Sequence, residues 1–308
     1  MLHPDFNFGT ETLSQIDASQ SKGLSFIERH GARIAYDYEA ARDARTTQLL
    51  VLVNGFVRPR ADFRAFRKRI HAQMPHLATL ALDNRGAGDT EGGLDNLTVE
   101  TMAQDAAFLA KTYAAALSLS SYHALGISMG GMICQVWAAC DPCVESVTLV
   151  STTAGGNART WPAGTDEEKM KEKGFTSWPK DFETMHKRMV RYFGSKFKKT
   201  SPLLIEMMVK NMLKSQGESS AHGKAEAQYN ATVGFNGTDY AKRIRCPALI
   251  LTGTEDEIIP KENADALCSL ISQAKKVELD AMGHLLLIED PENFVASVRS
   301  FIEGHVGD

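Results

Sequence analysis

Short apolar runs recur along the chain, and longer stretches with helical spacing separate them. The apolar runs are 48–54, 77–82, 122–127 and 147–150. The stretches with helical spacing lie near 61–73, 98–117 and 129–140. Uninterrupted apolar runs of this length are typical of strands that are covered on both faces. Their alternation with helices predicts a parallel sheet whose strands are joined by crossover helices.

The pattern extends towards both ends of the chain. Residues 24–29 and 33–38 alternate apolar and polar side chains around His30 and Gly31, which predicts an antiparallel hairpin. Later strands are expected at 247–253 and 275–279, and later helices near 261–272 and 292–303. We therefore predict the α/β class, with a mostly parallel central sheet flanked by helices.

Residues 152–240 interrupt this alternation and differ in composition from the rest. The segment holds six of the twelve methionines, and its fourteen Lys and Arg exceed its ten Asp and Glu. Apolar side chains with helical spacing are Phe182, Met185, Met189 and Phe193, followed by Leu204, Met208 and Met212. We predict a helical cap here, inserted after the fourth parallel strand between the core segments 24–151 and 241–308. Residues 1–23 would form an N-terminal extension.

Three methionines of this segment are candidates for substrate contact. Met185, Met189 and Met208 carry flexible thioethers, which adapt to irregular apolar shapes. The alternative is that they only pack the cap onto the sheet, as buried methionines commonly do.

Composition excludes several classes of protein. The chain has 308 residues, of which 43% are hydrophobic and 23% charged, and its net charge is −4. This balance gives no general attraction to nucleic acid or to anionic membranes. No apolar stretch reaches the roughly 18 residues that a membrane span needs, and the first residues lack the pattern of a secretory signal. We expect a cytoplasmic protein.

The five cysteines are sparse and odd in number, so we expect reduced thiols. Cys140 and Cys143 have CxxC spacing, but one pair cannot complete a zinc site. We therefore expect no bound metal.

Ser128 occupies the sharpest local motif. It follows the apolar run 122–127, precedes a helix, and has glycines at positions 126 and 130. A serine on such a strand-to-helix turn is forced into a strained conformation that projects its hydroxyl above the sheet. The next N–H, that of Met129, would lie at a helix N-terminus, where the dipole favours a developing negative charge.

A serine hydroxyl needs a base and an orienting carboxylate to act as a nucleophile. Among nine histidines, His284 is the one placed just beyond a late strand, in a strand-to-loop context. Asp256 lies at the exit of the preceding strand. Glu255 and Glu257 flank it, but alternation along the loop would direct their side chains elsewhere, so Asp256 is preferred.

The order Ser128, Asp256, His284 is that of one large group of enzymes. Further strings in matching order are Asn54-Gly55, Asp83-Asn-Arg85-Gly86-Ala-Gly88, Gly126-Ile-Ser128-Met-Gly130, Gly253-Thr-Glu-Asp256 and Gly283-His284. With these, the chain resembles α/β-hydrolases of the serine-triad kind, similar to 3-oxoadipate enol-lactonases, monoglyceride lipases and small esterases. The resemblance extends over about 24–305.

The resemblance implies cleavage of a small-molecule carboxylic ester or lactone, with an apolar or partly anionic substrate and no cofactor. The backbone N–H groups of Met129 and Phe56 would form the oxyanion hole. The family usually has His-Gly where this chain has Asn54-Gly55, although Asn54 can still hold the loop by hydrogen bonds.

Other activities use the same residues. Carbon–carbon bond hydrolases, acyltransferases and perhydrolases of this superfamily share the triad, and some members are small-molecule receptors without catalysis. The sequence predicts neither the natural substrate nor the oligomeric state.

Overall fold

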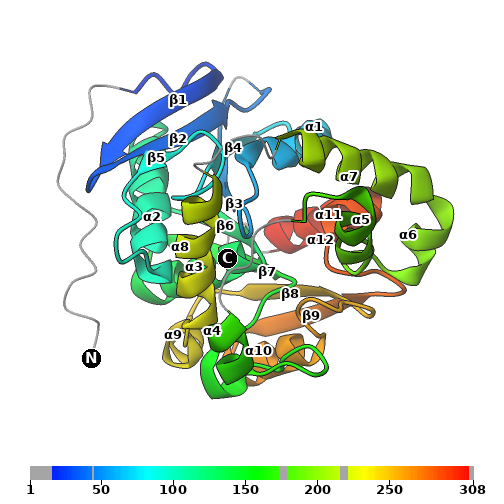
Figure 1. Cartoon of the computed structure of the whole chain (residues 1–308). Coiled ribbons are helices and arrows are strands. Elements are labelled where there is room, and N and C mark those ends of the chain that lie inside the picture. Colours follow the sequence, from blue (N-terminus) through cyan, green and yellow to red (C-terminus); the bar gives the residue numbers. More distant parts are fainter. Residues whose placement is uncertain (1–15, 44, 174–178, 216–220, 305–308) are drawn as a thin grey trace.

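The computed structural model describes residues 16–43, 45–173, 179–215 and 221–304 (Figure 1). Its strands are β1 Lys22–Arg29, β2 Ala32–Glu39, β3 Gln48–Val53, β4 Leu77–Leu82, β5 Glu91–Gly92, β6 Tyr122–Ile127, β7 Val144–Val150, β8 Ala248–Gly253 and β9 Ala274–Leu279. They form one sheet in the order β1-β2-β4-β3-β6-β7-β8-β9, with β5 paired to β2. Strands β1 and β2 are antiparallel to their neighbours, and β3, β4 and β6–β9 are parallel.

Helices cover both faces of this sheet. Those outside the β7–β8 connection are α1 Arg64–Gln73, preceded by the short helix η1 Arg60–Phe63, α2 Val99–Ala116, α3 Met129–Cys140, α10 Glu262–Leu270, α11 Leu286–Glu289 and α12 Pro291–Glu303. Alternate residues of β3 belong to different apolar layers, Leu49 and Val51 to one and Leu50 and Leu52 to the other. The first layer is covered by α2, α3 and α10, and the second by α1 and α12 (Figure 1).

The predicted α/β class and the parallel sheet are confirmed, and the apolar runs correspond closely to β3, β4 and β6. Strand β7 begins at Val144, three residues before the predicted start at residue 147. Glu145 and Ser146 make this end polar. Ser146 nevertheless belongs in the sheet, because its hydroxyl oxygen lies 2.8 Å from Nδ1 of the buried His123 on β6.

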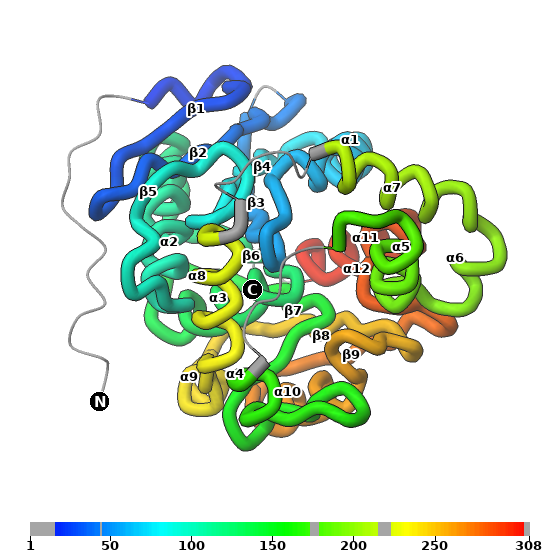
Figure 2. Tube along the Cα trace, in the orientation of Figure 1, coloured from blue at the N-terminus to red at the C-terminus, as the bar shows by residue number. Residues whose placement is uncertain are grey.

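The connection from β7 to β8 is helical. It contains η2 Gly156–Ala158, α4 Glu167–Lys173, α5 Phe182–Val190, α6 Ser195–Thr200, α7 Pro202–Ser215, α8 Ala221–Val233 and α9 Thr238–Arg243. We call residues 151–247 the β7–β8 segment. Figure 2 shows its trace leaving the sheet, with α5–α7 on one side and α8 and α9 on the other.

Helices α5 and α7 pack around a separate apolar cluster. Its buried members are Met185, Met189, Phe193, Phe197, Ile205 and Val209. The apolar residues with helical spacing in the sequence therefore lie on helices of the structure, except Phe193, which lies three residues beyond the end of α5. Helix α9 crosses residue 240, the predicted end of the cap, and its Tyr240 and Ala241 are buried in the main core. The division into core, cap and N-terminal extension stays a prediction. Residues 1–15, 44, 174–178, 216–220 and 305–308 of these segments lie outside the described residues.

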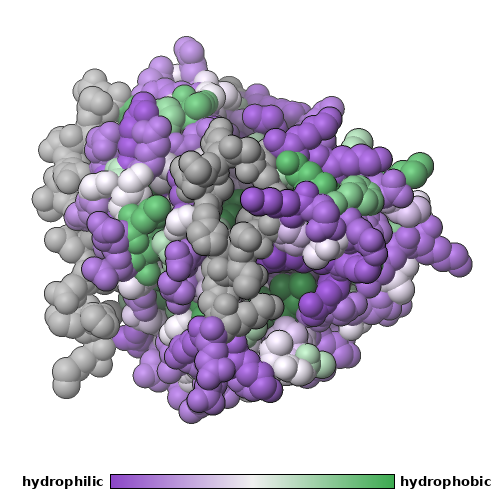
Figure 3. All heavy atoms as spheres, in the orientation of Figure 1, coloured by the Kyte–Doolittle hydropathy of each residue, from purple (hydrophilic) through white to green (hydrophobic). Residues whose placement is uncertain are grey.

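The surface is mainly hydrophilic on the face shown in Figure 3, and hydrophobic atoms appear within a central hollow. On α7, Leu203 and Met207 are exposed. Within the described residues, no helix combines the length and hydrophobicity that crossing a bilayer requires.

A buried polar cluster joins α1 to β4. Nε2 of His71 lies 2.9 Å from Oγ1 of Thr79, and Arg67 donates to the same oxygen. Burial, together with Arg67 and Arg42, lowers the pKa of His71 to about 4. The Glu39 carboxylate lies 3.8 Å from Nε2 of His71 and is itself partly exposed. His71 is therefore neutral at ordinary pH.

Candidate active site

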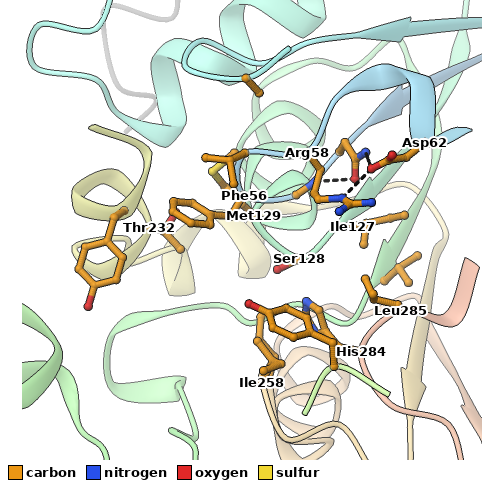
Figure 4. A pocket seen from close by; sticks show the side chains of 18 of the residues that line it. Phe56, Arg58, Asp62, Ile127, Ser128, Met129, Thr232, Ile258, His284 and Leu285 are labelled. Atoms are coloured by element: carbon orange, nitrogen blue, oxygen red, sulfur yellow. Dashed lines mark hydrogen bonds and ion pairs between the residues drawn. The ribbon is translucent and has the colours of Figure 1, made fainter. Parts of the chain in front are cut away.

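Ser128 connects β6 to α3 in a conformation that non-glycine residues rarely adopt. Its φ is 55° and its ψ is −117°. Four hydrogen bonds hold it there: its N–H donates to the Val150 carbonyl at 2.8 Å, and its carbonyl accepts from Gly131 N, Met132 N and Thr152 Oγ1. Strained backbone persists where surrounding bonds over-determine it, and such positions concentrate at functional sites. The hydroxyl is directed into a cavity (Figure 4).

Two glycines allow the turn at Ser128 to close. A Cβ atom on Gly126 would overlap the carbonyl group of Gly130, and one on Gly130 would overlap the carbonyl oxygen of Val53. Helix α3 can therefore begin directly against the ends of β3 and β6 only because both positions lack a side chain.

His284 and Asp256 form a buried pair at the exits of β9 and β8. Nδ1 of His284 lies 2.8 Å from Oδ2 of Asp256. The other oxygen of Asp256 accepts from the N–H groups of Ile258 and Ile259 at 2.8 and 2.9 Å. These donors hold the carboxylate in the orientation that accepts a hydrogen bond from the ring, which leaves Nε2 as the acceptor.

The two glutamates beside Asp256 point elsewhere. Glu255 accepts from the N–H and hydroxyl of Ser195 at the start of α6, at 2.5 and 2.7 Å. Glu257 pairs with Lys198 at 3.1 Å and with Arg191 at 3.4 Å. Both are exposed and tie the β8 exit to the β7–β8 segment.

Ser128 and His284 line the same cavity. Figure 4 shows Ser128 and His284 facing the same space, and Asp256 adjoins the His284 ring, so residues from three strand exits meet at one edge of the sheet. This edge is the carboxyl end of the parallel strands, where ligands of open α/β sheets usually bind.

The loop that carries His284 depends on two residues that sequence reasoning missed. The carbonyl of Tyr192 accepts from His284 N at 2.8 Å, and its ring meets the imidazole edge-on with centroids 5.7 Å apart. The partly buried carboxyl of Glu289 accepts from Gly283 N, Leu285 N and Gly194 N. Burial raises the pKa of Glu289, and these N–H donors oppose the rise. Neither residue belongs to a local motif that could have identified it.

The predicted oxyanion donors lie on the cavity wall near Ser128. Met129 is the first residue of α3, and the first N–H groups of a helix have no acceptor within the helix. Phe56 lies on the loop after β3 (Figure 4). Asn54 holds this loop as expected: its Oδ1 accepts from Gly55 N at 2.8 Å, and its Nδ2 donates to Pro59 O at 2.9 Å.

Gln228 of α8 connects the Phe56 loop to a second loop. Its Oε1 accepts from Val57 N at 2.6 Å, and its Nε2 donates to Arg85 O at 2.7 Å. The side chain is completely buried. Val57 has a φ of 51°, which is a strained value for a β-branched residue. The amide of Gln228 is thus one of the contacts that keep the residue after Phe56 in this conformation.

The cavity has a volume of about 550 Å³ and a largely apolar wall. Met185 and Met189, predicted as candidates for substrate contact, both line it, as does Met212. The prediction for Met208 needs correction: it packs into the α5–α7 cluster and is not among the described residues of the wall. Met212 lies one helical turn further along α7 and takes the place that Met208 was expected to fill.

Asp83 and Arg85 stabilise loops next to this wall. Arg85 donates to the buried Asp105 at 2.7 and 3.0 Å and to the Arg29 carbonyl at 2.9 Å. Asp83 accepts from Arg60 and from Asp89 N. Among the described residues, no group of three or more His, Cys, Asp or Glu side chains is placed to bind a metal, and all five cysteines are unpaired thiols.

Comparison with known proteins gives a consistent result. Residues 48–291 match the family model described as alpha/beta hydrolase fold. The AB hydrolase superfamily protein YisY of Bacillus subtilis is 25% identical over 231 residues, which are 72% of this chain and 80% of that protein. A shorter match to pyrrolizixenacetamide deacetylase of Xenorhabdus hominickii, 37% identical over 65 residues, spans 21% of this chain and 24% of the deacetylase.

Solved structures share the fold. A thermophilic esterase from Thermogutta terrifontis has a TM-score of 0.72 at 22% identity, covering 94% of this chain and 100% of its own. The enol-lactonase from Burkholderia xenovorans LB400 has a TM-score of 0.70 at 21% identity, covering 91% and 100%.

Proposed function

The chain belongs to the alpha/beta hydrolase fold family, and we propose that it hydrolyses a carboxylic ester or lactone through Ser128, His284 and Asp256. The observation that carries the proposal is the 2.8 Å contact between His284 and the buried Asp256 beside the cavity that Ser128 lines. An esterase and an enol-lactonase among proteins of the same fold add support.

The reaction would proceed in two steps. Nε2 of His284 removes the proton of Ser128 while Oγ attacks the carbonyl carbon of the substrate. The carbonyl oxygen becomes an oxyanion, which accepts hydrogen bonds from Met129 N and Phe56 N. His284 then gives its proton to the leaving alkoxide, and the acyl group stays on Ser128.

Water completes the cycle. His284 takes a proton from water as the hydroxide attacks the acyl-serine carbonyl, and then returns the proton to Oγ as the carboxylic acid leaves. Asp256, held by the N–H groups of Ile258 and Ile259, faces the imidazolium that forms and keeps the ring in place. Losing one oxyanion donor typically lowers the rate by about 10²–10³-fold.

The test uses p-nitrophenyl butyrate and a fluorophosphonate probe. The wild-type chain should release p-nitrophenol and take the label on Ser128, whereas Ser128→Ala should do neither and should keep the wild-type melting temperature. Rapid hydrolysis by Ser128→Ala would contradict the proposal. Binding of the ester without turnover by the wild-type chain would instead support the receptor alternative.

A further inference from the structure

The cavity wall carries a surplus of positive charge. Among the described residues, its basic side chains are Arg58, Arg159, Arg188 and Lys224, and its one carboxylate is Asp62. Arg58 Nε donates to Asp62 at 2.6 Å, so these two charges compensate each other. Since the whole chain carries a charge of −4, this concentration of cations is local to the cavity.

Arg159 is held in a defined position at the wall. Its guanidinium lies over the ring of Trp161, 3.8 Å from the centroid, and Nη1 donates to Thr232 O at 3.2 Å. The backbone beside it is fixed as well: the amide of the buried Asn263 accepts from Thr160 N at 3.0 Å and donates to Thr160 O at 2.8 Å. In the view of Figure 4, Ser128 and His284 lie between Thr232 and Leu285.

The charge of Arg159 has no close carboxylate partner in the part of the chain that the structure describes. Within the described residues, none lies within 4 Å of its guanidinium; Glu167 acts on it from further away and itself pairs with Lys171 at 2.5 Å. Burial lowers the pKa of Arg159 to about 10, so it remains a cation at neutral pH. A partly buried cation without a counter-charge is unfavourable, and an anion from outside relieves this.

We propose that Arg159 binds a carboxylate of the substrate, so that the preferred esters or lactones carry a second, ionised carboxyl group. The inference rests on the proposed function. Trp161 covers one face of the Arg159 guanidinium. The N–H groups of the guanidinium point outward in its plane, where they can donate two parallel hydrogen bonds to a planar carboxylate. Apolar wall residues such as Met185, Met189 and Ile258 would contact the carbon chain that joins the two groups.

Two matched pairs of esters test the proposal. On the acyl side, p-nitrophenyl hydrogen glutarate is compared with p-nitrophenyl valerate; on the alcohol side, para-carboxyphenyl acetate is compared with phenyl acetate. In at least one pair, wild-type kcat/KM should favour the carboxylate. Arg159→Met, which keeps an unbranched side chain over Trp161, should lower kcat/KM for that ester by about 10- to 100-fold. The neutral ester should be nearly unaffected.

Two further variants sharpen the test. Arg159→Lys keeps the charge without the planar fork and should retain part of the preference. Arg64→Met removes an exposed arginine outside the cavity wall and should retain all of it. Preference for the neutral ester in both pairs, or an equal loss on both members in Arg159→Met, would overturn the inference.

Ligand binding separates this inference from the proposed function. Glutarate should raise the melting temperature of Ser128→Ala, and should not raise that of the Ser128→Ala, Arg159→Met double variant. This readout needs no turnover, so it supports the carboxylate site even where Ser128 proves not to be the nucleophile. Ser128-dependent hydrolysis with no effect of glutarate would overturn the carboxylate site alone.

Discussion

Replacing Gln228 tests how the β7–β8 segment controls the loop that carries Phe56. Gln228→Met keeps the length of the side chain but removes the acceptor for Val57 N and the donor for Arg85 O. Each buried group left without a partner costs about 1–3 kcal/mol, so the free energy of unfolding should fall by about 2–6 kcal/mol. At about 2 °C per kcal/mol for a chain of this size, the melting temperature should fall by about 4–12 °C.

The same change should slow catalysis. Without Gln228 the strained Val57 can relax, and the adjacent N–H of Phe56, our proposed oxyanion donor, then moves. We expect kcat for p-nitrophenyl butyrate to fall about tenfold or more at a temperature where the variant is folded, with a smaller effect on KM, because the oxyanion forms only after binding.

Gln48→Met provides the matched control. Gln48 is also buried, and it pairs with His76 and His123 at the opposite end of β3 from Asn54. This variant should lower the melting temperature and leave kcat unchanged. If Gln228→Met loses stability but keeps wild-type kcat, the idea that Gln228 positions the Phe56 loop is wrong. If its melting temperature is unchanged, the energetic argument from the two buried hydrogen bonds is wrong.

Three further predictions follow from the site and the core. Asp256→Asn should lower kcat/KM by at least about 10³-fold, because the amide favours the wrong tautomer of the imidazole. Glu255→Gln and Glu257→Gln should lower kcat/KM far less. Equal losses for the three variants in the ester assay would mean that Asp256 is not the carboxylate that orients His284. His71, whose pKa is lowered to about 4, binds a proton more readily in the unfolded chain, so stability should fall as pH drops below about 6.5. Between pH 7 and pH 5, the free energy of unfolding measured in urea should fall by about 1–2 kcal/mol less for His71→Gln than for the wild type. Equal falls in the two proteins would refute this prediction. Gly130→Ala should destabilise the chain by about 3 kcal/mol, measured by the same method, because the added methyl group overlaps a β3 carbonyl; an unchanged stability would mean that α3 can shift freely.

Local patterns were enough to predict most of the sheet. Strands β3, β4 and β6 are buried throughout because helices cover both faces, and their sequences are therefore mostly apolar. The turn at Ser128 could be found because its glycines are needed for a close backbone approach. The start of β7 was missed because a buried serine and histidine satisfy each other there, which an apolar pattern does not register.

The contacts that support the site could not be predicted in the same way. Gln228 meets Val57 across 171 positions of sequence, and Arg159 meets Thr232 across 73. Tyr192 supports His284 through its carbonyl group, which every residue possesses. Such contacts depend on how the β7–β8 segment folds back onto the sheet, and neither spacing nor residue type records that path.

The β7–β8 segment contacts both sides of the candidate site. Tyr192 accepts a hydrogen bond from the loop of His284, and Gln228 accepts one from the loop of Phe56. Specificity engineering that grafts this segment from a relative would therefore exchange structural supports together with pocket walls. A successful chimera would have to present a carbonyl acceptor at position 192 and a side-chain amide at position 228. A graft chosen for pocket shape alone should yield a folded chain that binds its new substrate and turns it over slowly.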